Sequence, residues 1–131
     1  YHSIDRRLMF VEVKRLSDDR LYSKGAKSAE VINQLRRYKA RLKTEVQQIT
    51  NQYNNTIDYY NTLSGGKLPH VSLEFPPLLG LLLVEYNQSE KKQINEVKEM
   101  ITRNGFKSYA IGDTSHVKED STMRAIYNAL K

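Results

Sequence analysis

The most hydrophobic stretch of the 131-residue chain, residues 78–86, constrains the fold more than any other segment. Its sequence, LLGLLLVEY, is apolar at both odd and even positions, so a strand formed there has two faces to bury. We therefore expect a central strand that other elements cover on both sides. The apolar run itself, residues 78–84, is far too short to cross a bilayer, and we expect no contact with a membrane.

Strand-like and helix-like segments alternate along the rest of the chain. Strands separated by helices need crossover connections, so we predict an α/β fold with a mixed central sheet, flanking helices and one long helix. The first two strands are expected to form a hairpin. The expected strands are 1–7, 8–14, 78–86 and 106–111, and the expected helices are 29–63, 90–103 and a last one from residue 121.

The length of the chain and its helix-breaking residues indicate how it is divided. A chain of 131 residues suits one hydrophobic core, so we expect residues 1–131 to form a single domain. A serine and two glycines follow the long helix and two prolines precede the next strand, which predicts an internal linker at residues 64–77. The sequence begins within what reads as an element, and we expect a domain truncated at its N-terminus.

The long helix carries an apolar seam that extends beyond the part expected to pack on the sheet. Ile49, Tyr53, Tyr60 and Leu63 follow helical spacings of three and four, with a polar interruption at residue 56. We expect residues 29–63 to present this seam to a second copy of the chain or to a partner subunit.

The strand expected at residues 8–14 ends on a charged pair. Its period of two places Glu12 and Lys14 on one face, with Val11 and Val13 on the other. A carboxylate and an ammonium near a core are costly unless they are paired or used. Two interpretations stay open: a surface ion pair where the strand runs into solvent, or a site in which the acid binds a metal beside the lysine.

The order and spacing of two motifs carry a resemblance to a known family. A strand ending in Glu12-x-Lys14, followed by a helix with Gln34-x-x-x-Tyr38, resembles the PD-(D/E)XK nuclease superfamily, in particular its RecB-like branch, over roughly residues 8–112. The resemblance implies a partial restriction-endonuclease-like core that hydrolyses DNA phosphodiester bonds. It also implies a role in restriction, defence or repair in the cytoplasm of a prokaryotic cell.

The same resemblance assigns roles to individual residues. Glu12 and the backbone carbonyl of Val13 are the implied ligands of Mg²⁺ or Mn²⁺. Lys14 is expected to hold the attacking water or to stabilise negative charge, and Gln34 and Tyr38 are expected to place the site and the DNA.

A second acidic ligand is the missing part of this pattern. The family has an aspartate on the strand before Glu-x-Lys, and Asp5 is the acidic residue available there. Alternatively that aspartate lies upstream of Tyr1, and the chain is then expected to bind metal poorly and to be inactive alone. Glu85, at the end of the central strand, either approaches the site or lies at the surface.

A formal net charge of +6 favours a polyanionic partner, because cations that bind phosphates release counterions. Much of the excess lies around the expected site, although a solvated helix face has the same composition. The chain has no cysteine, so a disulfide or thiolate site is excluded, and its three histidines lack the spacing of a zinc site. The expected DNA contacts are Arg15, Lys24, Lys27, Arg37 and Arg41.

Two other functional classes remain open from the sequence. The chain is alternatively a non-catalytic nucleic-acid-binding or assembly module that keeps a nuclease-like fold. A third interpretation is a helical oligomerisation domain whose charge is incidental.

Overall fold

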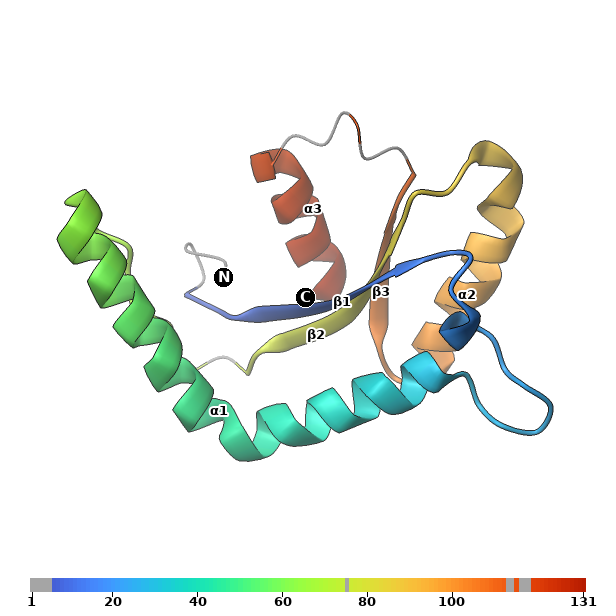
Figure 1. Cartoon of the computed structure of the whole chain (residues 1–131), viewed down its shortest axis with the longest axis horizontal. Helices are drawn as coiled ribbons and strands as arrows, with labels where there is room; N and C mark the ends of the chain where they lie inside the picture. Colours follow the sequence, from blue (N-terminus) through green and yellow to red (C-terminus); the bar gives the residue numbers. More distant parts are fainter. Residues whose placement is uncertain (1–5, 75, 113–114, 116–118) are drawn as a thin grey trace.

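The central feature of the fold is a three-stranded parallel sheet (Figure 1). The computed structural model describes residues 6–74, 76–112, 115 and 119–131. The sheet consists of β1 (Met9–Arg15), β2 (Leu78–Val84) and β3 (Lys107–Ile111), in the spatial order β1-β2-β3. The helices are α1 (Glu30–Ser64), α2 (Lys91–Arg103) and α3 (Glu119–Leu130), and single 3-10 turns lie at Asp19–Leu21 and Gln88–Glu90.

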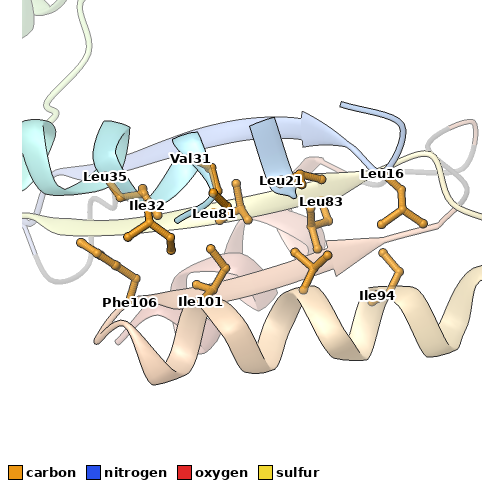
Figure 2. Packing of buried hydrophobic residues seen from close by; sticks show 12 residues of the cluster. Leu16, Leu21, Val31, Ile32, Leu35, Leu81, Leu83, Ile94, Ile101 and Phe106 are labelled. Atoms are coloured by element: carbon orange, nitrogen blue, oxygen red, sulfur yellow. The ribbon is translucent and has the colours of Figure 1, made fainter. Parts of the chain in front are cut away.

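Helices cover both faces of the sheet, as the apolar pattern of residues 78–86 predicts. In Figure 1, α1 and α2 lie on one face and α3 lies on the other. Leu81 and Leu83 of β2 are fully buried against α1 and α2, and Figure 2 shows both side chains between those helices. Leu78 and Leu82 belong to the smaller cluster under α3. The expectation of a central strand covered on both sides is confirmed.

Gly80 of β2 allows α3 to approach the sheet closely. A Cβ atom at this position would lie 2.2 Å from Cδ2 of Leu130 and 2.9 Å from the carbonyl oxygen of Lys107. The second of these atoms belongs to the backbone of the neighbouring strand and cannot rotate away. A side chain at this position would therefore push α3 and β3 away from β2.

We expect Gly80→Ala to lower the free energy of unfolding by about 1–3 kcal/mol, because it overpacks the contact with α3. Urea unfolding followed by circular dichroism measures this loss. Leu130→Ala in the same background removes one of the two clashes, so the two changes together should cost less than the sum of their separate effects. Strict additivity would show that Gly80 is not at a close contact.

Helix α1 has two arms that meet at a bend (Figure 1). Val31, Ile32 and Leu35 in the first arm are fully buried against the sheet. The hydroxyl of Thr44 donates to the carbonyl oxygens of Ala40 and Arg41, at 3.3 and 3.1 Å. Such bonds to the preceding turn are a known cause of helix bending. The second arm thus turns away from the helix layer.

The second arm of α1 packs on its own chain. Ile57 is buried with Leu8 and Val71, and Ile49 packs against the same cluster. The seam predicted to meet another subunit is therefore partly occupied. Side chains that remain exposed near the end of the arm are Tyr59, Tyr60 and Leu63.

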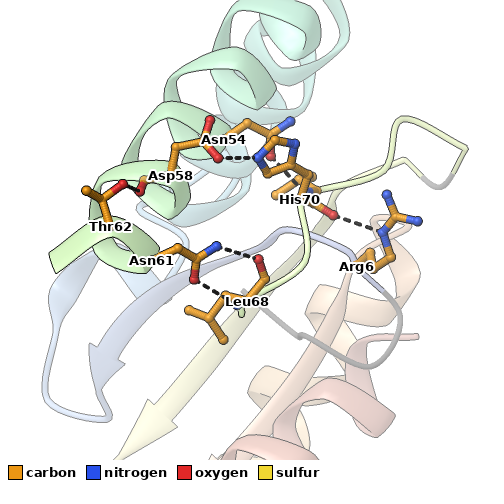
Figure 3. A network of polar contacts seen from close by, with 8 residues as sticks. Arg6, Asn54, Asp58, Asn61, Thr62, Leu68 and His70 are labelled. Atoms are coloured by element: carbon orange, nitrogen blue, oxygen red, sulfur yellow. Dashed lines mark hydrogen bonds and ion pairs between the residues drawn. The ribbon is translucent and has the colours of Figure 1, made fainter. Parts of the chain in front are cut away.

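The segment predicted as a linker is tied to α1 by polar contacts (Figure 3). The side-chain amide of Asn61 donates to the Leu68 carbonyl at 2.9 Å and accepts from the Leu68 N–H at 2.8 Å. The Val71 N–H donates to Oδ1 of Asn54 at 2.7 Å, and His70 lies 2.7 Å from Asp58. Residues 66–72 are thus a strap fastened along the second arm.

We expect Asn61→Ala to destabilise the chain by about 1–2 kcal/mol, because the strap loses two hydrogen bonds to one side chain. Limited proteolysis should also cut residues 66–72 faster in this variant. Asn55→Ala is the matched control, because the exposed Asn55 lies on the same arm of the helix. Equal cleavage of the two variants would contradict the fastening role of Asn61.

Two further expectations have clear outcomes. The long helix predicted at residues 29–63 is confirmed at Glu30–Ser64. The described strands are all parallel, where a mixed sheet was expected, because each pair is joined through a helical crossover. The antiparallel arm expected at residues 1–7 lies mostly outside the described residues. Among the described helices, none combines the length and apolar character needed to span a membrane.

Candidate functional site

The candidate site is built around a buried lysine at the end of β1. Lys14 is only 5% exposed, although its side chain carries an ammonium group. Its Nζ lies 2.5 Å from Oε1 of Glu12 and 3.8 Å from Oδ2 of Asp18. Both acidic side chains are mostly buried as well. The interpretation of a strand running into solvent with a surface ion pair is therefore wrong.

Asp18 is held in place by the loop that follows β1. It caps the Asp19–Leu21 turn by accepting from the N–H of Arg20 at 3.0 Å. Its carboxylate also accepts from Nε and Nη2 of Arg20, at 2.8 and 2.6 Å. These bonds to Arg20 are the main reason that the pKa of Asp18 falls to about 2, with the charge of Lys14 contributing less.

The same geometry places the Arg20 guanidinium close to several acidic side chains. The hydrogen bonds to Asp18 raise the pKa of Arg20, and the charges of Glu30 and Glu12 raise it further. Two cations, Lys14 and Arg20, thus stand against two anions, Glu12 and Asp18. The charges of this group of four side chains balance.

Glu12 also opens into a cavity of about 510 Å³ between β1 and the middle of α1. Tyr38 borders this cavity and is 41% exposed, and Arg41 and Glu45 form an ion pair of 2.8 Å in its wall. The structure therefore brings Glu12 and Tyr38 to one cavity. The ion pair between Glu12 and Lys14 connects Lys14 to the same cavity wall.

Gln34 lies one helical turn before Tyr38 and faces the same side of α1. Its Oε1 atom is buried and has no hydrogen-bond partner among the described residues. Buried polar atoms are normally satisfied, so this acceptor is a candidate partner for a bound water or ligand. Gln34 itself is not among the residues that line the cavity of Glu12 and Tyr38.

Val13 faces away from this group, but its peptide carbonyl lies at the sheet edge. The Leu8 carbonyl accepts from the N–H of Leu78 at 2.9 Å, and peptide groups alternate in direction along a strand. The Val13 carbonyl therefore points away from β2, toward an edge with no further strand among the described residues. The Val13 side chain is 52% exposed on the opposite face.

A second cavity, also about 510 Å³, lies at the carboxyl ends of β1 and β2. Lys14, Asp18 and Glu85 border it, and Glu85 binds Arg15 at 2.7 Å. Glu85 has a φ of 57°, which is uncommon for a residue other than glycine. Of the two alternatives for Glu85, the structure shows the surface position: Glu85 is exposed and pairs with the exposed Arg15.

Asp18 and Arg20 were not identified from the sequence. They lie between the strand expected at residues 8–14 and the helix expected at residues 29–63, in a polar segment where acids are common. The available signal was Asp18 at a turn-capping position two residues before an arginine. Asp5, the acid that was singled out, lies outside the described residues.

The basic residues expected to contact DNA divide into two groups. Arg15, Lys24 and Arg41 form ion pairs with Glu85, Asp19 and Glu45, respectively. Arg37 and Lys27 are exposed. Local acids therefore offset part of the positive charge on this surface.

The oxygen atoms near Lys14 are of the type that binds hard cations such as Mg²⁺. Among the described residues, no group of three or more histidines and acids has metal-binding geometry. Magnesium, however, is often held by one or two carboxylates together with waters and substrate phosphates. Glu12 and the Val13 carbonyl supply oxygen atoms of this class, whereas both oxygens of Asp18 are held by Arg20.

Comparisons with known proteins assign no family to the chain. No family model, no curated protein and no solved structure matches it.

The lowered pKa of Asp18 predicts how acid acts on the fold. Because its pKa is lower in the folded chain than the usual 3.8, the ionised group stabilises the fold above about pH 4, and this contribution disappears as the pH falls toward 2. The difference in free energy of unfolding between the wild type and Asp18→Asn should therefore shrink over that range. Urea unfolding at several pH values measures it, and a difference independent of pH would contradict the assignment.

Proposed function

We propose that this chain is part of a metal-dependent deoxyribonuclease with a restriction-endonuclease-like core of the PD-(D/E)XK type. The observation that carries the proposal is Lys14, a buried ammonium held between two carboxylates at the end of a parallel strand. Burial of charged groups is expensive and is concentrated at functional sites. The orphan oxygen of Gln34 and the cavity shared by Glu12 and Tyr38 support it.

The proposed roles follow from the chemistry of each group. Hydrolysis forms a bond from a water oxygen to phosphorus and breaks the bond from phosphorus to the leaving oxygen. Lys14 carries a fixed positive charge beside the acids, suited to stabilising negative charge on a phosphate oxygen. Glu12 and the Val13 carbonyl would hold Mg²⁺ or Mn²⁺, which when bound supplies charge neutralisation and a more acidic water.

The helix residues have supporting roles in this proposal. The buried acceptor of Gln34 would receive a hydrogen bond from a bound water or from the reorganised site. Tyr38 is 41% exposed and borders the cavity, where a nucleotide can contact it. A role in restriction, defence or repair in a prokaryotic cytoplasm belongs to the same proposal and rests on analogy.

A second candidate function is a non-catalytic nucleic-acid-binding or assembly module. One observation favours it: both acids of the site are already neutralised by Lys14 and Arg20. In that case the ion pairs stabilise the fold, and exposed basic residues of α1 bind the phosphates.

Cleavage assays separate the two functions. We expect the wild type to cut labelled single- or double-stranded DNA in Mg²⁺ or Mn²⁺, and Glu12→Gln or Lys14→Met to cut about 10²–10³-fold more slowly. Their DNA affinity, measured in EDTA, should change little. Glu45→Gln is the matched control, because Glu45 borders the same cavity as Glu12 but binds Arg41.

The opposite result has an equally clear signature. A binding module would show no metal-dependent cleavage by the wild type. Its affinity would fall with salt and with neutralisation of Arg36 and Arg37, independently of Glu12.

A further inference from the structure

Because Lys14 is buried, its ammonium needs a negatively charged partner at all times. Glu12 alone does not supply one when it binds a ligand. Lys14 is only 5% exposed, so bulk water compensates poorly for the loss of an ion-pair partner. Its closer partner is Glu12, at 2.5 Å, and Glu12 is the side chain that opens into the cavity beside α1. Whenever a cation or another ligand engages Glu12, Lys14 loses part of its compensation.

Asp18 is the other carboxylate within reach of Lys14. Its Oδ2 atom lies 3.8 Å from Nζ of Lys14, which is the range of an ion pair without close contact. Arg20 holds both oxygens of Asp18, so the carboxylate has a fixed position. A small movement of the Lys14 ammonium toward Asp18 is then enough to change its partner.

The loop that carries Asp18 is itself anchored. The Asp18 N–H donates to the Arg15 carbonyl at 3.0 Å, which turns the chain back toward the strand. Leu16 and Leu21 on either side are buried in the main core. The hydroxyl of Tyr22 donates to the Leu16 carbonyl at 2.5 Å and accepts from Gln93 of α2 at 2.7 Å. Asp18 is therefore positioned by the core and does not depend on Glu12.

We propose that Asp18, fixed by Arg20, is the reserve counter-ion of Lys14 and holds the ammonium in place when Glu12 is engaged by a ligand. Asp18 is thus a positioning residue that acts through Lys14. Its role during the reaction rests on the proposed nuclease function, whereas its exchange with Glu12 as partner of Lys14 does not.

A double-mutant cycle on stability tests the exchange without any assay of activity. Glu12→Gln imitates an engaged Glu12, and Asp18→Asn removes the reserve. If either acid alone can compensate Lys14, the double variant should lose at least about threefold more in the folding equilibrium constant than the product of the single losses. Urea unfolding at pH 7 measures these constants, and an excess below about threefold would overturn the proposal.

Two further variants keep the cycle interpretable. Glu85→Gln combined with Glu12→Gln is the matched control, because Glu85 borders the cavity at the strand ends but binds Arg15. The losses that these two changes cause in the folding equilibrium constant should multiply, with no excess in the double variant. Lys14→Met in the double variant removes the uncompensated charge and should restore stability. If the double variant does not fold, Lys14→Met should restore its folding. Failure to restore either would overturn the proposal.

A magnesium titration links the exchange to the proposed function. Mg²⁺ should raise the thermal midpoint of the wild type, and the rise should be smaller in Asp18→Asn, where engagement of Glu12 leaves Lys14 without a partner. A rise of equal size in both proteins would overturn the link. If the wild type neither binds Mg²⁺ nor cleaves DNA, the proposed function fails, while the stability cycle still decides the role of Asp18.

Discussion

The enclosure of β2 between two helix layers is the constraint on which the rest of the structure depends. Leu81 and Leu83 fill the interface with α1 and α2, and the opposite face receives α3 over Gly80. With both faces occupied, further strands can join only at the edges. β1 and β3 join as parallel neighbours, so the carboxyl ends of all three strands lie at one edge of the sheet. Open α/β sheets commonly carry their sites at such an edge.

The electrostatics of the site are compact and nearly neutral. Lys14 and Arg20 share the carboxylates of Glu12 and Asp18, so the field of the group falls off quickly with distance. The net charge of +6 therefore acts mainly through other side chains, such as the exposed Arg37. This separation leaves basic side chains at the surface and a charge-balanced group of side chains in the interior.

The sequence predicts the fold well where periodicity is strong. The run at residues 78–86 predicts a strand covered on both faces, and the 3.6-residue spacing predicts the long helix to within about a residue at each end. The packing of the second arm of α1 depends in part on contacts with residues 66–72. Those contacts are polar and distant in sequence, so no local pattern reports them.

The site is predictable only in part for a related reason. A period of two brings Glu12 and Lys14 to one face, and the structure joins them. Asp18 reaches the same lysine through a turn whose geometry depends on Arg20 and on the burial of Leu16 and Leu21. Polar loop residues are common and their side-chain directions are set by tertiary packing, so the sequence does not single out Asp18.

The strap along α1 has a consequence for how the chain opens. The first arm is anchored by apolar burial, whereas the second arm relies largely on amide and imidazole contacts with residues 66–72, supported by the small cluster around Ile57. Polar contacts at the surface exchange readily with water, so the second arm forms a cooperative unit of lower local stability than the sheet. The second arm is therefore expected to open locally more readily than β1, the strand that carries both Glu12 and Lys14.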